Sequence, residues 1–252
     1  MLENGSVPIE HPFWFATLLN KLLGGLVTPL MVKVGFPPAH PHHPIPGYVA
    51  GEILVLLVIL IGAIVLRRQL SVENPGKFQQ TMELFLEFTQ GLADEMIGHG
   101  ARRYVPLIGT LGIFILFCNV LGLIPTFVTP TASIPVPLGC AALVFVHYNL
   151  QGFREHGILG YFRHLCGPMM AIAIIMFPTE VFSNFLRMLS LSVRLWANML
   201  VGGILEHVFT SLVPIAVPTI FMALHVFESF LQAYVFMILP ALYIGLAVSR
   251  EH

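Results

Sequence analysis

The segment LSLSVRLWANMLVG, residues 189–202, places an arginine inside a long apolar run. The guanidinium of Arg194 stays charged because arginine is not deprotonated inside proteins. Such a charge costs at least about 2.5–3.5 kcal/mol at the centre of a bilayer, so an intramembrane arginine indicates a function. No acid lies within one helical turn of Arg194 along the chain. Its compensating carboxylate must therefore come from another helix or from another chain.

Other polar residues share a helical face with Arg194. At about 100° per residue, five of them fall within about 40° of it: Glu180, Ser183, Arg187, Ser190 and Asn198. Glu180 lies about 21 Å from Arg194 along the helix axis, which is most of a membrane crossing. A buried polar seam between helices would explain Ser183 and Arg187. It explains Arg194 poorly, so we assign this arginine a functional role.

The last two apolar stretches carry a second set of titratable residues: Glu206, His207, His225 and Glu228. His225, Glu228 and Gln232 have i, i+3 and i+7 spacing, which places them on one face of a helix. This set and Glu180 lie on opposite sides of Arg194. The pattern predicts two half-pathways for an ion, separated by a fixed positive charge. Taken singly, each residue is also compatible with a satisfied polar group between helices.

The elements that position these residues are membrane-spanning helices. Of 252 residues, 56% are hydrophobic and 10% are charged, whereas soluble domains carry about 25% charged residues. Backbone polar groups must be satisfied within the segment when it crosses lipid, which favours helices. We therefore predict an all-α integral membrane protein with about five transmembrane helices, at residues 48–66, 105–127, 136–156, 165–212 and 213–248.

Basic residues predict the orientation of these helices. Eight of the twelve flank alternate ends of the apolar stretches: Arg67, Arg68, Lys77, Arg102, Arg103, Arg154, Arg163 and Arg250. The turns at 129–137 and 211–218 carry no charge. The positive-inside rule then places the N-terminus outside and the C-terminus in the cytoplasm. Five spans give the same result.

The segments outside the spans divide into an arm and an amphipathic helix. Residues 1–47 form an extracytoplasmic arm and linker, and residues 48–252 form the membrane domain. Within the arm, 12–34 is either an interfacial helix or a short re-entrant piece, and 37–46 is a proline-rich linker. Residues 77–99 have an apolar and a polar face, which predicts a helix on the cytoplasmic membrane surface.

Several classes of function lack support in the sequence. The net charge of −1 gives no nucleic-acid footprint, and no phosphate loop or cofactor motif is present. The three cysteines lack metal-ligand spacing and are interpreted as packing residues. The linker contains three histidines, His40, His42 and His43. They could bind a metal, but exposure to solvent is the simpler interpretation.

Four stretches together closely resemble subunit a of rotary F-type ATP synthases: LSLSVRLWANMLVG, His225 to Gln232, QAYVFMILPALYIGLA, and GLIPTFVTPTAS at 122–133. The resemblance runs from about Gly51 to the C-terminus. It implies a non-catalytic stator subunit that passes protons through two offset half-channels to the carboxylates of a rotating c-ring. It also implies long, tilted last helices, and peripheral-stalk b subunits as further partners.

The resemblance assigns roles residue by residue. The arginine that faces the ring carboxylates matches Arg194, and the family's asparagine and glutamine match Asn198 and Gln232. The cytoplasmic acid matches Glu180, and His225 falls where relatives carry His or Glu. Many bacterial relatives carry a carboxylate at the position of Gly203, so here Glu206 or Glu228 would supply that acid. The loop before the third span also departs from the family pattern, at Ser133, Pro135 and Pro137.

Two other functions are compatible with a polar membrane protein. A free-standing secondary transporter would need a partner acid for Arg194 within the chain, and usually paired half-repeats, which the sequence lacks. A haem-containing oxidoreductase would need paired histidines at matched depth on neighbouring spans. The candidates for such ligands are scattered along the chain: His147, His207 and His225.

Overall fold

The structure, a computed structural model, describes residues 14–34, 44–98, 100–124, 127, 129–166, 170–212 and 216–248. The linker histidines His40, His42 and His43 lie outside these ranges. Within the described ranges all regular structure is helical, and no strand occurs. The α-helices are α1 (Trp14–Val34), α2 (Gly47–Gln69), α3 (Lys77–Ile97), α4 (Val105–Leu121), α5 (Pro135–Cys166), α6 (Met170–Leu212) and α7 (Ala216–Val248), with short 3-10 turns η1 (Ala101–Arg103) and η2 (Pro130–Ala132).

Four helices are long and apolar enough to cross a membrane. They are α2, the Pro135–Glu155 part of α5, and the parts of α6 and α7 at Met176–Leu205 and Thr219–Val248. Helix α4 is also apolar but has only 17 residues, about 26 Å, and it ends six residues before the predicted boundary. The chain turns at Gly122, whose N–H bonds back to the Asn119 carbonyl oxygen. The predicted all-α membrane fold is thus confirmed, with one short helix among its spans.

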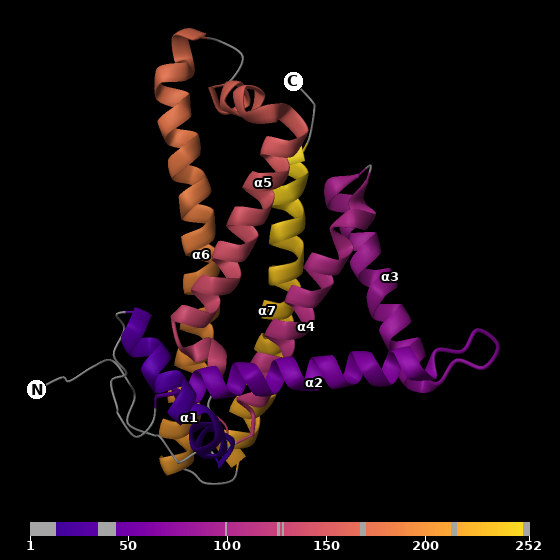
Figure 1. Cartoon of the computed structure of the whole chain (residues 1–252), viewed down its shortest axis with the longest axis vertical. Coiled ribbons are helices and arrows are strands. Elements are labelled where there is room, and N and C mark those ends of the chain that lie inside the picture. The colour runs from indigo at the N-terminus through magenta and orange to yellow at the C-terminus, as the bar shows by residue number, and fades with distance from the viewer. Residues whose placement is uncertain are drawn as a thin grey trace, which may run out of the picture.

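Helices α5, α6 and α7 run alongside one another, and α2 lies across their direction (Figure 1). Helix α6 has 43 residues and α7 has 33, which gives lengths of about 64 and 50 Å. Both exceed the hydrocarbon thickness of about 30 Å. The prediction that the last two helices are long is therefore confirmed.

Helix α5 contains a break at the predicted end of the third span. Gly157 has a φ of 71° inside the helical range, a left-handed conformation that glycine adopts at little cost. The first helical segment of α5 therefore ends close to His156, where the third span was predicted to end, and a second segment continues to Cys166. A turn at this point directs residues 158–166 away from the line of the first part of α5 (Figure 1).

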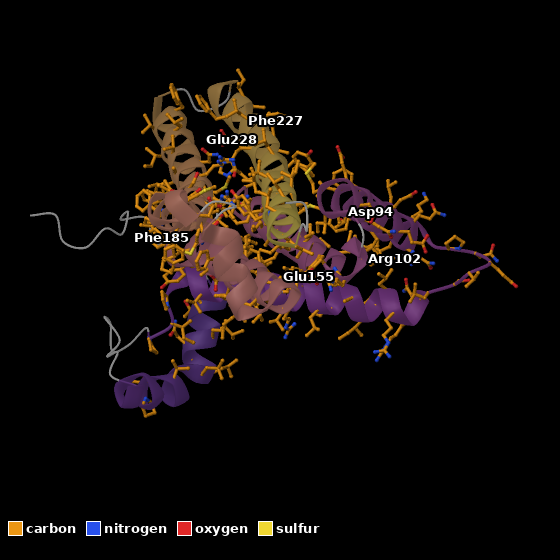
Figure 2. All side chains as sticks on the ribbon, turned by 90° about the horizontal axis from the view of Figure 1, so that it is seen from above. Asp94, Arg102, Glu155, Phe185, Phe227 and Glu228 are labelled. Carbon is orange, nitrogen blue, oxygen red and sulfur yellow. The ribbon has the colours of Figure 1, made fainter. Side chains whose placement is uncertain are left out.

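The amphipathic helix α3 confirms the predicted periodicity at 77–99. Its buried side includes Thr89, Leu92 and Ala93, which belong to or adjoin the core formed with α4, α5, α6 and α7. Close backbone approach fixes its end against α7, because a Cβ added at Gly245 would overlap the Met96 carbonyl oxygen. The charged residues Asp94 and Arg102 lie on the α3 side of the molecule, away from Phe185 and Phe227 on α6 and α7 (Figure 2).

Candidate functional site

Helix α6 presents Arg194 on its exposed side. The opposite side buries Leu191, Leu195 and Met199, which are at most 2% exposed and belong to the main core. Since Arg194 is offset from this buried side, its side chain is exposed, and Ser190 on the same face is exposed as well. Among the residues that the structure describes, the ion pairs are Arg103–Glu155 and Arg187–Glu180, and neither involves Arg194. A permanent cation thus lies in the middle of an apolar helix without a described counter-ion.

Helix α7 buries a line of polar side chains against its neighbours. His225 is 3% exposed, Ser229 is fully buried and Gln232 is 1% exposed. The Ser229 hydroxyl donates a hydrogen bond of 2.8 Å to the His225 carbonyl oxygen, which satisfies that hydroxyl within the helix. The buried line follows the i, i+4, i+7 spacing of one helical face; it contains Ser229, whereas the sequence analysis placed Glu228 with His225 and Gln232.

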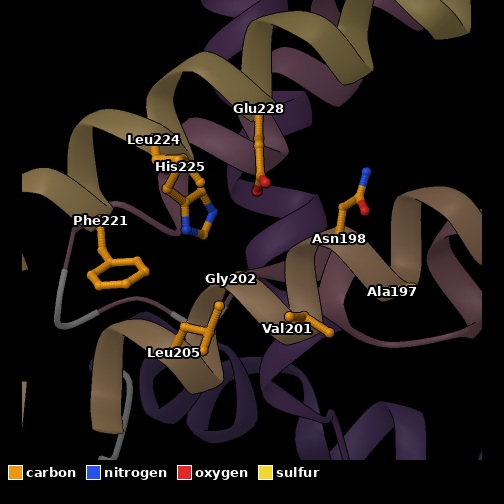
Figure 3. A pocket seen from close by; sticks show the side chains of 9 residues that line it. All are labelled: Ala197, Asn198, Val201, Gly202, Leu205, Phe221, Leu224, His225 and Glu228. Atoms are coloured by element: carbon orange, nitrogen blue, oxygen red, sulfur yellow. The ribbon is translucent and has the colours of Figure 1, made fainter. Parts of the chain in front are cut away.

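A cavity of about 140 Å³ separates α6 from α7 at this line. Three polar side chains line it, those of Asn198, His225 and Glu228. Apolar side chains and Gly202 form the rest of the lining. Figure 3 shows His225 and Glu228 projecting from α7 toward the α6 segment that carries Asn198 and Gly202. The volume is several times that needed for one water molecule, and the polar lining could bind water.

Gly202 sets the distance between the two helices at the cavity. A Cβ at this position would lie 3.3 Å from Nδ1 of His225 and 3.6 Å from Oε2 of Glu228. A larger side chain would therefore compete for the space that these two polar groups occupy. A Cβ at Gly203 would meet no atom of the described residues within 4 Å.

Two acceptor oxygens beside this cavity lack partners within the described chain. Oε2 of Glu228 and Oε1 of Gln232 are buried, and neither has a hydrogen bond to a residue that the structure describes. Buried polar atoms are costly unless they are hydrogen-bonded. The two atoms therefore mark a place where water or a proton donor would be stabilised.

The other end of the polar stripe contains an ion pair. Nη2 of Arg187 lies 4.0 Å from Oε1 of Glu180, and the Arg187 guanidinium lies 5.4 Å from the ring centroid of Tyr243 on α7. Arg187 is therefore directed toward α7, whereas Arg194 is exposed on α6. The two arginines share a helical stripe but have different surroundings.

The structure brings together some of the predicted residues and separates others. Asn198, His225 and Glu228 line one cavity, and Gln232 lies one turn further along α7. Glu180 lies at the other end of the stripe, beside Arg187. The side chains of Glu206 and His207 lie outside the part of the chain that the structure describes, although their backbone belongs to α6.

Two residues that shape this site, Gly202 and Tyr243, were not predicted from the sequence. The Gly202–Gly203 pair inside an apolar helix is a signal for close helix approach, although it does not say which glycine faces the neighbour. Tyr243 gave no signal, since an aromatic residue in an apolar helix is ordinary. A third missed feature is the buried hydrogen bond of 2.6 Å from the Thr131 hydroxyl to Oδ1 of Asn119.

Comparison with known proteins gives the family. The family described as ATP synthase A chain matches residues 49–245. ATP synthase subunit a of Koribacter versatilis is 43% identical over 244 residues, covering 97% of this chain and 100% of the relative. The subunit a of Solibacter usitatus is 42% identical over 235 residues, covering 93% and 100%. That of Sulfurihydrogenibium sp. is 40% identical over 179 residues, covering 71% and 86%. This chain therefore belongs to the ATP synthase A chain family, as a multi-pass membrane protein of the ATP synthase membrane sector.

Proposed function

We propose that the chain is the non-catalytic stator subunit that conducts protons to and from the c-ring, with Arg194 as the fixed charge between two half-channels. The observation that carries the proposal is the exposed Arg194 side chain, which has no ion pair with any residue that the structure describes. A carboxylate on a neighbouring rotor would supply the missing counter-ion. A self-contained transporter would instead hold this charge within its own chain.

The outer half-channel is assigned to the cavity between α6 and α7. His225 and Glu228 line it together with Asn198, and Gln232 lies one turn further along α7. A proton from outside passes along these groups and neutralises a ring carboxylate. Only the neutral acid can then face lipid, because burying an unpaired carboxylate is very costly. Glu206, on the outer part of α6, is assigned to the entrance of the same pathway.

The inner half-channel is assigned to the region of Glu180. After almost a full turn of the ring, the protonated acid reaches this region and releases its proton toward the cytoplasm. Arg194 then stabilises the ionised carboxylate and prevents protons from passing directly between the half-channels. Ser190, exposed on the same face of α6, lines the path of the ring carboxylate. Each charge that moves through about 100 mV releases about 2.3 kcal/mol.

The proposal includes a topology and partners. Residues 1–47 lie outside a bacterial plasma membrane, residues 48–252 form the membrane domain, and the C-terminus lies in the cytoplasm. Basic residues at alternate span ends support this orientation. The partners are the c-ring at Arg194, the peripheral-stalk b subunits, and lipid.

The substitution Arg194→Ala tests the central assignment. We expect it to abolish ATP-driven proton pumping in inverted vesicles, while the subunit still co-purifies with the c-ring. Val193→Ala is the matched control, because Val193 is the adjacent, 46% exposed residue of the same helix, and it should leave pumping unchanged. Normal coupled pumping by the Arg194→Ala enzyme would refute the role given to this arginine.

A further inference from the structure

Helix α1 is fixed to the beginning of α2 by a specific polar contact. The Asn20 side chain donates a hydrogen bond of 3.0 Å to the Ile45 carbonyl oxygen and accepts one of 2.9 Å from the Ile45 N–H. Leu19 packs with Ile45 and Ala50 in a small buried cluster beside these bonds. The amide and the cluster hold α1 at the first turns of α2, which is a membrane-crossing helix.

Among the α1 residues whose side chains the structure describes, those that point away from this contact are apolar with one charge. Trp14, Leu18 and Leu22 are 57%, 46% and 70% exposed, and their i, i+4, i+8 spacing makes a continuous edge. Lys21 is exposed beside this edge. A helix with an apolar edge, a lysine and a tryptophan has the composition of helices that lie in the membrane interface.

The position of α1 favours lipid as the covering partner. Helix α1 has 21 residues, and its first half carries the polar side chains of Asn20 and Lys21, which would be costly in the hydrocarbon core of a bilayer. Its packing neighbours on α2 belong to the first turns of that helix: Val49, Ala50, Ile53 and Leu54. Beyond this contact, α2 carries further exposed apolar side chains, which include Leu56 and Ile61. A lipid leaflet that contacts α2 meets α1 at the level of its headgroups.

We propose that α1 is an interfacial anchor in the leaflet where α2 begins. Its Trp14–Leu18–Leu22 edge enters the upper acyl region, and Lys21 binds the phosphate of an anionic lipid headgroup. This inference does not depend on the proton path, since it requires only that α2 crosses the membrane. It resolves the alternatives for residues 12–34 in favour of an interfacial helix over a re-entrant one.

Spin labels in the assembled complex test the depth of α1. Labels at Leu18→Cys and Leu22→Cys, in a background without native cysteines, are compared with two references in reconstituted membranes. Ile61→Cys is the lipid reference, at an exposed site in the middle of α2, and Val72→Cys is the water reference, fully exposed after α2. We expect oxygen accessibility of both α1 labels to lie between the two references, and accessibility to an aqueous nickel chelate also to be intermediate.

The other outcomes contradict the proposal in identifiable ways. Labels as accessible to the nickel chelate as Val72→Cys would place α1 in water. Labels with the same accessibilities as Ile61→Cys would show that α1 is re-entrant. Labels protected from both oxygen and the nickel chelate would show that protein, and not lipid, covers this edge. For Lys21, the Leu22→Cys label should lie deeper in membranes containing phosphatidylglycerol than in pure phosphatidylcholine, and Lys21→Gln should remove this difference. Equal depth in both lipids with Lys21 intact would overturn the headgroup assignment.

Discussion

Gly202 on α6 lies directly opposite His225 on α7, so that a single added carbon would come within 3.3 Å of the imidazole Nδ1. The same carbon would lie 3.6 Å from Oε2 of Glu228. Because Gly202 has no side chain, two titratable groups of the neighbouring helix have space to lie opposite it. In this chain an acid and a histidine come from one helix, one turn apart, and they face a glycine on the other.

The first prediction concerns this spacing. Gly202→Leu should fill the cavity, and overpacking a well-packed contact costs about 1–3 kcal/mol. We expect α6 and α7 to separate or the two polar groups to be displaced, with a large loss of passive proton conduction through stripped membrane vesicles. Gly203→Leu is the control, because a Cβ there meets no atom of the described part of the chain within 4 Å. Equal conduction by the two variants would contradict the role of Gly202.

The second prediction separates two candidate outer acids. Glu228→Gln keeps the shape of the side chain but removes its ability to carry a proton as a carboxylate. Proton transfer through a positioned side chain contributes about 10²–10⁴-fold in rate, so we expect passive conduction to fall by about tenfold or more.

The same assay of Glu206→Gln then places the second acid. Slower conduction in this variant would support an entrance role for Glu206, and an unchanged rate would leave the role to Glu228. Glu87→Gln serves as the control, since Glu87 is exposed on α3 far from the cavity in sequence and structure. If Glu228→Gln conducts at the normal rate, the cavity does not carry the protons.

The third prediction concerns the Arg187 contacts. The ion pair with Glu180 is partly exposed, and exposed pairs contribute about 0.2–1 kcal/mol. The cation–π contact with Tyr243 adds about 0.5–1 kcal/mol. A double-mutant cycle of Arg187→Gln and Tyr243→Leu, measured by thermal unfolding of the purified complex, should therefore give a coupling energy below about 1 kcal/mol. Tyr243→Phe, which keeps the aromatic face, should preserve the coupling.

The activity of the Arg187 variants distinguishes the two arginines. We expect Arg187→Gln to retain ATP-driven pumping at a reduced rate, because Arg187 is directed toward α7 and not to the exposed face of α6. Complete loss of pumping in a stably assembled Arg187→Gln complex would show that both cations act on the ring.

The fourth prediction concerns helix packing at the end of α7. Gly245→Val should prevent α7 from packing against the end of α3, since even a Cβ would overlap the Met96 carbonyl oxygen. Backbone cannot move aside as a flexible side chain can, so we expect a strong decrease in membrane-assembled subunit, measured by immunoblot and protease resistance. Gly91→Val on α3 is the control, because a Cβ at Gly91 meets nothing within 4 Å. Normal assembly of Gly245→Val would contradict this packing.

Much of the fold could be predicted from patterns that are local to one segment of the sequence. Long apolar runs gave α2, α6 and α7, and the 3.6-residue period gave α3, because both signals are local to one segment. The boundaries of α4 and α5 were less predictable. The early end of α4 depends on the turn at Gly122, and the left-handed conformation of Gly157 ends the first segment of α5 and redirects the second.

The charged residue of the candidate site could be predicted from the sequence, because a charge is costly in lipid. The neutral residues could not, because their role depends on the packing between helices. Arg194 stands out in the sequence because lipid penalises its charge, and the structure leaves it exposed. Gly202 and Tyr243 are neutral and ordinary in composition, and their importance arises only from what α7 and α6 place opposite them. The contact between Arg187 and Tyr243 joins residues 56 positions apart, a relationship that no local pattern contains.

The crossing of α2 over the direction of α6 and α7 (Figure 1) has a geometric consequence. In a bilayer that α2 crosses nearly upright, α6 and α7 are inclined toward the membrane plane, so distance along them is mainly lateral. The roughly 21 Å between Glu180 and Arg194 is then mainly a lateral separation and only a modest change of depth. In the mechanism proposed above, a proton that enters near one of these residues therefore leaves at a laterally displaced point, and rotation of the ring covers that displacement.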